Sequence, residues 1–155
     1  MKTLFFRKLK DALRLRGREV ITLVGGGGKT SLMYALAREM VEAGRKVITT
    51  TTTKIWVPLS GETEMLLINP DIGALKEALK EHYHVTCVSN VNVEGKAVGV
   101  KPSMVKLWME NLNVDCIVVE ADGAKGKPLK APAAHEPVIP PSTTLYIPMA
   151  GIDAL

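Results

Sequence analysis

The chain alternates between two patterns of apolar and polar residues. Short runs rich in β-branched residues predict strands, at 20–24, 46–52, 65–68, 85–88, 115–120 and 143–147. Apolar residues that recur at helical spacing predict helices, at 3–16, 31–43, 72–80 and 102–110. The segment 91–100 predicts a β-hairpin that turns at Glu94-Gly95. Strands that alternate with helices are typical of the α/β class, in which helices flank a mostly parallel sheet.

A run of glycines separates the first strand from the first long helix. The apolar strand 20–24 precedes the glycines, and the amphipathic helix 31–43 and the strand 46–52 follow them. A strand, a loop, a helix and a second strand in this order form a βαβ unit. Such a unit places its two strands parallel, with a right-handed crossover between them.

The glycine run has the chemistry of a phosphate-binding loop. Consecutive glycines accept positive φ, so their backbone N–H groups can converge on an anion. The helix that follows adds unpaired N–H groups and the positive end of its dipole. Lys29 would place an ammonium group at the β- and γ-phosphates, and the Thr30 hydroxyl would bind Mg²⁺. We therefore expect ATP or GTP with Mg²⁺ to bind at Gly25, Gly26, Gly27, Gly28, Lys29, Thr30 and Ser31.

The motif departs from the usual phosphate-loop pattern, G-x-x-x-x-G-K-[ST], because Leu23 stands where the first glycine should be. The spacing agrees with the variant K-G-G-x-G-K-[ST] of dimeric ATPases and metallochaperone-type GTPases, with Val24 in place of the leading lysine. A homodimer is therefore one expected assembly, without a lysine that reaches across it. A flexible glycine linker is the alternative, and the flanking strand and amphipathic helix argue against it. A G-x-G-x-x-G dinucleotide motif would leave Lys29 and Thr30 without a role.

Polar residues follow two of the predicted strands. Ligands of open α/β sheets bind beyond the carboxyl ends of the strands, so Thr52, Thr53 and Lys54 are candidates for the substrate side of the site. The alternative is that these threonines are simply good strand residues, which is our interpretation of Thr49 and Thr50.

A buried strand, 115–120, ends in the acidic pair Glu120 and Asp122. The two are one residue apart, so in a strand they share a face. In phosphate-loop proteins an acid at such a strand end holds Mg²⁺ or its water. We expect Lys29, Glu120 and Asp122 to be the catalytic residues, and Thr30, Glu120 and Asp122 to be the metal ligands. A plain Asp-Gly turn is the alternative for Asp122.

Two further groups of charged residues carry weaker signals. Lys125, Lys127 and Lys130 follow the acidic strand end, and they either face solvent or capture an anion. His82 and His84 lie at the end of a predicted helix, and we expect them on the surface.

Composition is that of a globular domain. The 155 residues include 46% hydrophobic and 23% charged residues, with a net charge of +4. This length and composition predict one domain. The pattern of elements divides it into an N-terminal helix (1–17) and an α/β core (18–155). The two cysteines have no metal-site spacing, which fits a reducing, cytoplasmic compartment. We expect no membrane segment and no nucleic acid, because apolar runs are short and aromatic residues few. The core lacks a helix after its last strand, so we expect a C-terminal part beyond Leu155.

Three segments carry a family resemblance: the glycine loop at 24–30, the run TTTTTK at 49–54, and EADGAKGKPLKAPAAHEP at 120–137. With these, the chain resembles the accessory proteins of selenium-dependent molybdenum hydroxylases, also called selenium cofactor biosynthesis proteins (YqeC-like). The resemblance implies a cytoplasmic phosphate-loop protein that helps to install a selenium centre. Carried over by position, it implies that Lys29 and Thr30 hold phosphate and Mg²⁺, and that Lys130 and Glu136 shape the second-substrate side.

Two kinds of function remain open. The first is a nucleotide-dependent accessory enzyme, an NTPase or a small-molecule kinase acting in molybdenum cofactor metabolism. The second is a nucleotide-switched carrier that delivers selenium or cofactor to a molybdenum hydroxylase or a maturation protein. The absence of a C-x-x-C motif argues against metal delivery, and the absence of a guanine-reading N-K-x-D favours ATP over GTP.

Overall fold

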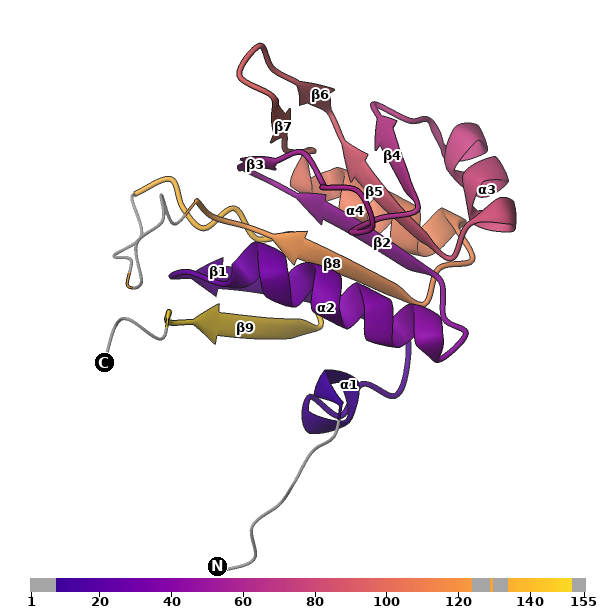
Figure 1. Ribbon diagram of the computed structural model, residues 1–155, viewed down its shortest axis with the longest axis horizontal. Helices are drawn as coiled ribbons and strands as arrows, with labels where there is room; N and C mark the ends of the chain where they lie inside the picture. Colours follow the sequence, from indigo (N-terminus) through magenta and orange to yellow (C-terminus); the bar gives the residue numbers. More distant parts are fainter. Residues whose placement is uncertain (1–7, 124–128, 130–133, 152–155) are drawn as a thin grey trace, which may run out of the picture.

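The computed structural model describes residues 8–123, 129 and 134–151 and has an α/β fold (Figure 1). A six-stranded sheet has the order β4-β5-β2-β8-β1-β9, and all of its paired strands are parallel. Its strands are β1 (Glu19–Gly25), β2 (Val47–Thr51), β4 (Met65–Ile68), β5 (His84–Val88), β8 (Cys116–Glu120) and β9 (Leu145–Met149). The helices are α1 (Leu9–Ala12), α2 (Lys29–Glu42), α3 (Ile72–Glu81) and α4 (Pro102–Asn111).

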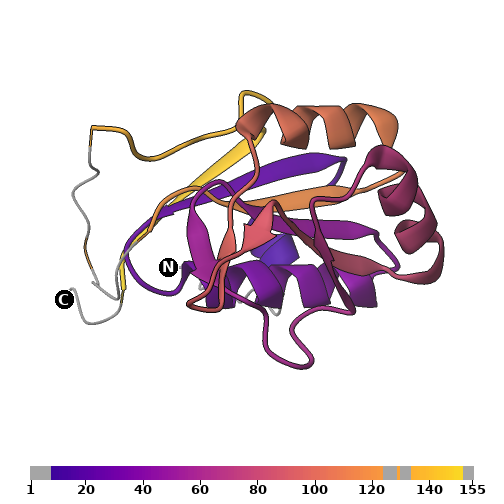
Figure 2. The same cartoon turned by 90° about the horizontal axis from the view of Figure 1, so that it is seen from above.

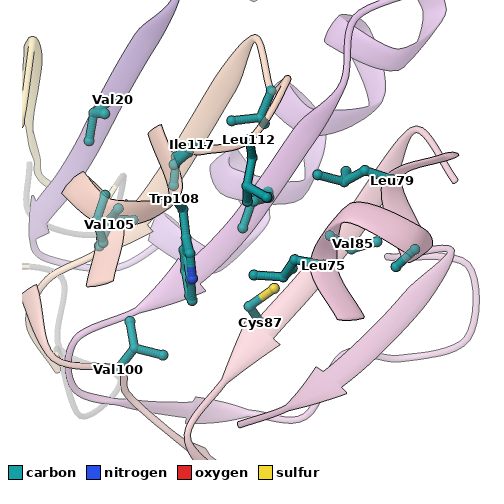
Figure 3. Close-up of a cluster of buried hydrophobic side chains, with 14 residues drawn as sticks. Val20, Leu75, Leu79, Val85, Cys87, Val100, Val105, Trp108, Leu112 and Ile117 are labelled. Atoms are coloured by element: carbon teal, nitrogen blue, oxygen red, sulfur yellow. The ribbon is translucent and has the colours of Figure 1, made fainter. Parts of the chain in front are cut away.

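Helices cover both faces of the sheet, as Figure 2 shows with α2 on one side and α4 on the other. The central strands are buried on both faces, which explains their continuous apolar runs. One core cluster joins α3 and α4 to the sheet around the fully buried Trp108 (Figure 3). A second cluster joins α2 to the opposite face through Met33, Ala37 and Met40.

The helix boundaries follow from local signals. Asp71 caps α3, because its carboxylate accepts a hydrogen bond from the backbone N–H of Ala74 at 2.7 Å. Pro102 is the first residue of α4, where its missing N–H costs nothing. The predicted α/β class and the predicted helices at 31–43, 72–80 and 102–110 are confirmed.

A second, three-stranded sheet lies beyond the carboxyl ends of β2 and β5 (Figure 1). It contains β3 (Lys54–Trp56), β7 (Lys96–Val98) and β6 (Asn90–Val91), in the order β3-β7-β6. The predicted hairpin is confirmed as β6 and β7, which pair antiparallel. The strand β3 was not predicted. Its three residues are too few for a periodic pattern, and its partner β7 is distant in the sequence.

The N-terminal helix is shorter than predicted. Within the described residues it covers Leu9–Ala12, and the positive φ of Arg14 rules out continuation to 16. The backbone N–H groups of Leu9 and Lys10 donate to the carboxylate of Glu39, so α1 packs on α2. No helix among the described residues is long and apolar enough to cross a membrane.

The expectation that His84 lies on the surface is wrong. His84 begins β5 and is buried, with its Nε2 atom 2.9 Å from the Thr49 hydroxyl. Thr49 and Thr50 are structural, as predicted. Thr49 also contacts the Thr86 hydroxyl at 2.7 Å, and Thr50 donates to the Cys87 carbonyl at 2.6 Å.

Candidate functional site

The glycine run forms a tight turn between β1 and α2. Gly25 and Gly28 have φ of 99° and 91°, a region that L side chains rarely adopt. A Cβ atom on Gly25 would lie 2.4 Å from the carbonyl oxygen of Met149, in the neighbouring strand β9. The same carbonyl accepts a hydrogen bond from the Gly26 N–H at 2.7 Å. The turn therefore requires glycine at position 25 for both its conformation and its close contact with β9.

Lys29 is the first residue of α2, and its ammonium group is buried within the turn. Only 2% of the residue is exposed. Its Nζ atom donates to the carbonyls of Gly25 at 2.6 Å and Gly26 at 3.0 Å. The same atom lies 3.2 Å from Oδ1 of Asp122 and 4.0 Å from Oε1 of Glu120. A buried lysine needs such partners, because an unpaired charge in the interior is unfavourable.

Asp122 and Glu120 come from the end of β8, which lies between β1 and β2 in the sheet. The Asp122 carboxylate accepts the Gly25 N–H, with its nearer oxygen at 2.9 Å. The Glu120 carboxylate accepts the Thr30 hydroxyl at 2.7 Å. Burial raises the pKa of Glu120, while the Thr30 hydrogen bond and the Lys29 charge act in the opposite direction. The two acids therefore hold the glycine turn and the start of α2 against the sheet.

The donor set fits a hard divalent cation. A threonine hydroxyl and a carboxylate oxygen, in contact with each other beside a second carboxylate, are ligands that Mg²⁺ accepts together with water and phosphate. Within the described part of the chain, no group of three or more His, Cys, Asp or Glu residues could hold a metal alone. Phosphate oxygens and water could complete the coordination of a metal held by the Thr30 hydroxyl and the Glu120 carboxylate.

A pocket of about 770 Å³ lies in front of this cluster. The predicted site residues that line it are Gly26, Gly27, Gly28, Lys29, Thr30, Thr52, Thr53, Lys54, Glu120 and Glu136. Gly25 and Asp122 are not among the lining residues, because they contact each other beneath the turn. Ser31 is exposed and does not line the pocket either. Lys130, like Lys125 and Lys127, lies outside the described residues.

Side chains from distant segments complete the pocket wall. The Thr52 hydroxyl donates to the Val138 carbonyl at 2.6 Å, which ties the end of β2 to the segment after β8. The Gly123 N–H lies 3.4 Å from the Glu136 carboxylate. Trp56 and Lys96 also line the pocket, and the sequence did not predict either as a site residue. The three residues Lys54 to Trp56 are too few for their alternation to predict a strand, so no local signal in the sequence placed Trp56 at the pocket.

Comparison with known proteins gives the family. The model of the family described as YqeC protein matches residues 21–155. The chain belongs to the YqeC family. It is 36% identical over 135 residues to a protein of Escherichia coli (strain K12) described as "Uncharacterized protein YqeC". That alignment covers 85% of this chain and 51% of the relative, so the chain spans about half of the length of this YqeC protein. No solved structure matches the chain.

Membership of the YqeC family confirms the resemblance stated from the sequence. The match begins within β1 and includes the glycine turn, the end of β8 and the pocket. The nucleotide, the metal and the selenium connection stay predictions.

Proposed function

We propose that this chain binds a nucleoside triphosphate with Mg²⁺ at the glycine turn, ATP in preference to GTP. One observation carries the proposal: a glycine turn at the start of a helix buries Lys29 against Glu120, the last residue of β8, and Asp122, which follows that strand. A lysine, a hydroxyl and an acid placed together at the start of a helix support binding of a polyphosphate and a metal. In a YqeC protein, such binding would serve the maturation of selenium-dependent molybdenum hydroxylases.

The residues of the turn have separate tasks in the proposed complex. The N–H groups of Gly27 and Gly28 and the first turn of α2 would bind phosphate oxygens. Lys29 would exchange its carbonyl contacts for phosphate oxygens and stay beside Asp122. Thr30 and Glu120 would hold Mg²⁺, which when bound compensates the phosphate charge. Asp122 would keep the turn in place through the Gly25 N–H.

A small-molecule kinase is the second candidate. The pocket continues from the glycine turn to Lys54 and Trp56 of the small sheet, which leaves room for an acceptor molecule facing the phosphates. In that case catalysis would come from positioning and from charge stabilisation by Lys29.

Isothermal titration calorimetry with ATP, GTP and non-hydrolysable analogues, with and without Mg²⁺, tests nucleotide binding. We expect Lys29→Ala to weaken binding at least about thirtyfold, because a buried charged partner of the phosphates is lost. Lys106→Ala is the matched control, since Lys106 lies on the exposed surface of α4 with 61% of its side chain accessible. Equal affinity of wild type and a folded Lys29→Ala protein would refute the proposal.

The metal ligands are tested by a matched pair at Thr30. Thr30→Ser keeps a hydroxyl and should keep the gain in affinity that Mg²⁺ produces, whereas Thr30→Ala should lose most of it. The selenium connection needs its own experiment, in which a longer YqeC protein captures metabolites and selenium species that are identified by mass spectrometry. Recovery of nucleotide without any selenium or molybdenum cofactor species would count against that part of the proposal.

A further inference from the structure

One face of the small sheet lines the pocket opposite the glycine turn. Side chains alternate between faces along a strand, so Lys54 and Trp56 share one face of β3 while Ile55 points to the other. In the register with β7, Lys96 is opposite Trp56 and Val98 is opposite Lys54. All four of these residues line the pocket, and so does the buried Ile55 between Lys54 and Trp56. Ile55 and Ala97 are buried in the core beneath them.

The two tryptophans of the chain differ in a way that points to a ligand. Trp108 is 1% exposed and belongs to the core, whereas Trp56 is 65% exposed at the pocket. An indole ring left in contact with water at a pocket wall is a surface on which another flat ring can stack. The Lys96 ammonium group lies 5.1 Å from the centre of this ring, so a cation accompanies the aromatic surface. Lys54 adds a second exposed ammonium group on the same face.

The small sheet is held firmly against the main sheet. A Cβ atom on Gly99 would lie 2.4 Å from the carbonyl carbon of Thr52, so the chain after β7 touches the backbone that leaves β2. The N–H groups of Gly99 and Val100 donate to the carbonyls of Thr53 at 2.6 Å and Thr51 at 2.8 Å. These contacts give the Trp56 face, which consists of Lys54, Trp56, Lys96 and Val98, a defined position relative to the glycine turn.

We propose that this face is a second ligand site, for a planar aromatic molecule that carries a negatively charged group. The ring would stack on Trp56 and the anion would pair with Lys96 and Lys54. The role of the ligand as an acceptor beside the nucleotide rests on the proposed function, but the binding chemistry of the face does not. Glu94 competes for the ligand position, because its carboxylate lies 3.3 Å from the Lys96 ammonium group.

The alternative is that Trp56 and Lys96 are a cross-strand pair that only stabilises the small sheet. Glu94 separates the two interpretations. Removing its charge with Glu94→Gln should strengthen binding of an anionic ligand, since a competing carboxylate is lost. A purely structural pair would show no such gain.

The test uses the two indole N–H signals in ¹⁵N–¹H correlation spectra of the Lys29→Ala chain, so that the glycine turn cannot capture the probe through its lysine. The probe is quinoline-2-carboxylate, with neutral quinoline-2-carboxamide and non-aromatic cyclohexanecarboxylate as controls. The variant Trp56→Phe assigns the Trp56 signal, and Trp108 is the internal reference. We expect the probe to shift the Trp56 signal saturably and to leave the Trp108 signal in place.

The affinity of the probe for three variants, Trp56→Leu, Lys96→Gln and Glu94→Gln, decides the outcome. We expect Trp56→Leu to weaken the probe about tenfold or more, as read from backbone N–H signals of β7. Lys96→Gln should weaken it several-fold and Glu94→Gln should strengthen it. Equal shifts with all three compounds, or unchanged affinity in Trp56→Leu, would overturn the proposal. So would a Trp56 signal that moves with MgATP in the wild type while Trp56→Leu weakens ATP, because the face would then bind the nucleobase.

This design separates the second site from the proposed function. A chain that binds the probe but no nucleotide would keep the aromatic anion site and lose the nucleotide proposal. A chain that binds nucleotide but not the probe would keep the nucleotide proposal and lose the aromatic anion site.

Discussion

The two sides of the pocket differ in the burial of their charged residues. On the glycine-turn side, Lys29, Glu120 and Asp122 are 2%, 6% and 1% exposed, and Lys29 forms an ion pair with each of the two acids. On the small-sheet side, Lys54 and Trp56 are exposed to the pocket. Buried charges need fixed partners, so the first side is held in one arrangement before any ligand arrives. Exposed charges are solvated and mobile, so the second side can adapt to a ligand at little cost in fold stability.

The largest effect should come from breaking the buried cluster. Asp122→Ala removes the closest carboxylate from Lys29 and the acceptor from the Gly25 N–H, so we expect a loss of about 3 kcal/mol in the free energy of unfolding. Urea denaturation measures it, with Glu110→Ala on the surface of α4 as the control. The contrast between the two sides would be wrong if both variants had the same small effect.

His84 is buried like Lys29, but its hydrogen-bond partner is the neutral Thr49 hydroxyl. Burial lowers the pKa of His84 from 6.5 to about 4, against a smaller opposing effect of the Glu64 charge. The unfolded chain then binds a proton at higher pH than the folded chain. The free energy of unfolding should therefore fall by about 2–3 kcal/mol as the pH drops from 6.5 to 4.

The measurement for His84 is the difference in unfolding free energy between wild type and His84→Gln at each pH. Both proteins keep Glu120, whose raised pKa stabilises the folded state as the pH falls, so this opposite contribution cancels. A difference that stays constant between pH 7 and 4 would show that His84 does not titrate as its burial predicts.

A smaller effect should come from the contact between the two sheets. Gly99→Ala would force a methyl group against the Thr52 backbone, so we expect a loss of about 2 kcal/mol in stability and weaker binding of aromatic anions. Gly17→Ala is the matched control, because nothing lies within 4 Å of a Cβ atom there. Thermal unfolding compares the two. Equal behaviour would mean that the small sheet is not held by this contact.

The smallest effect on stability should come from the exposed side. Lys96→Gln removes a partly exposed charge that pairs with Glu94 and lies over Trp56, so stability should change by no more than about 1 kcal/mol. Its effect should instead appear in ligand binding. If Lys96→Gln lowered the free energy of unfolding as much as Asp122→Ala does, Lys96 would be a residue that stabilises the fold.

Prediction from the sequence succeeded where the signal is local. Helical spacing located α2, α3 and α4, and β-branched runs located the strands of the main sheet. It failed where long-range contacts dominate. The strand β3 is too short to show a pattern, and His84 is buried because β5 pairs with β2 rather than because of its neighbours in the sequence. The position of Glu120 and Asp122 at the end of a strand was predicted correctly, because a strand end followed by a turn is a local feature.

The sequence by itself determined the α/β class, the glycine turn that starts α2, and the acidic end of β8, because each depends on the order and type of adjacent residues. Only the tertiary structure decided that Lys29 is enclosed by Asp122 and Glu120, and that the Trp56 face lies opposite the turn. These contacts join segments far apart in the chain. They exist because the strand order places β8 between β1 and β2, and because the backbone after β7 packs against the end of β2.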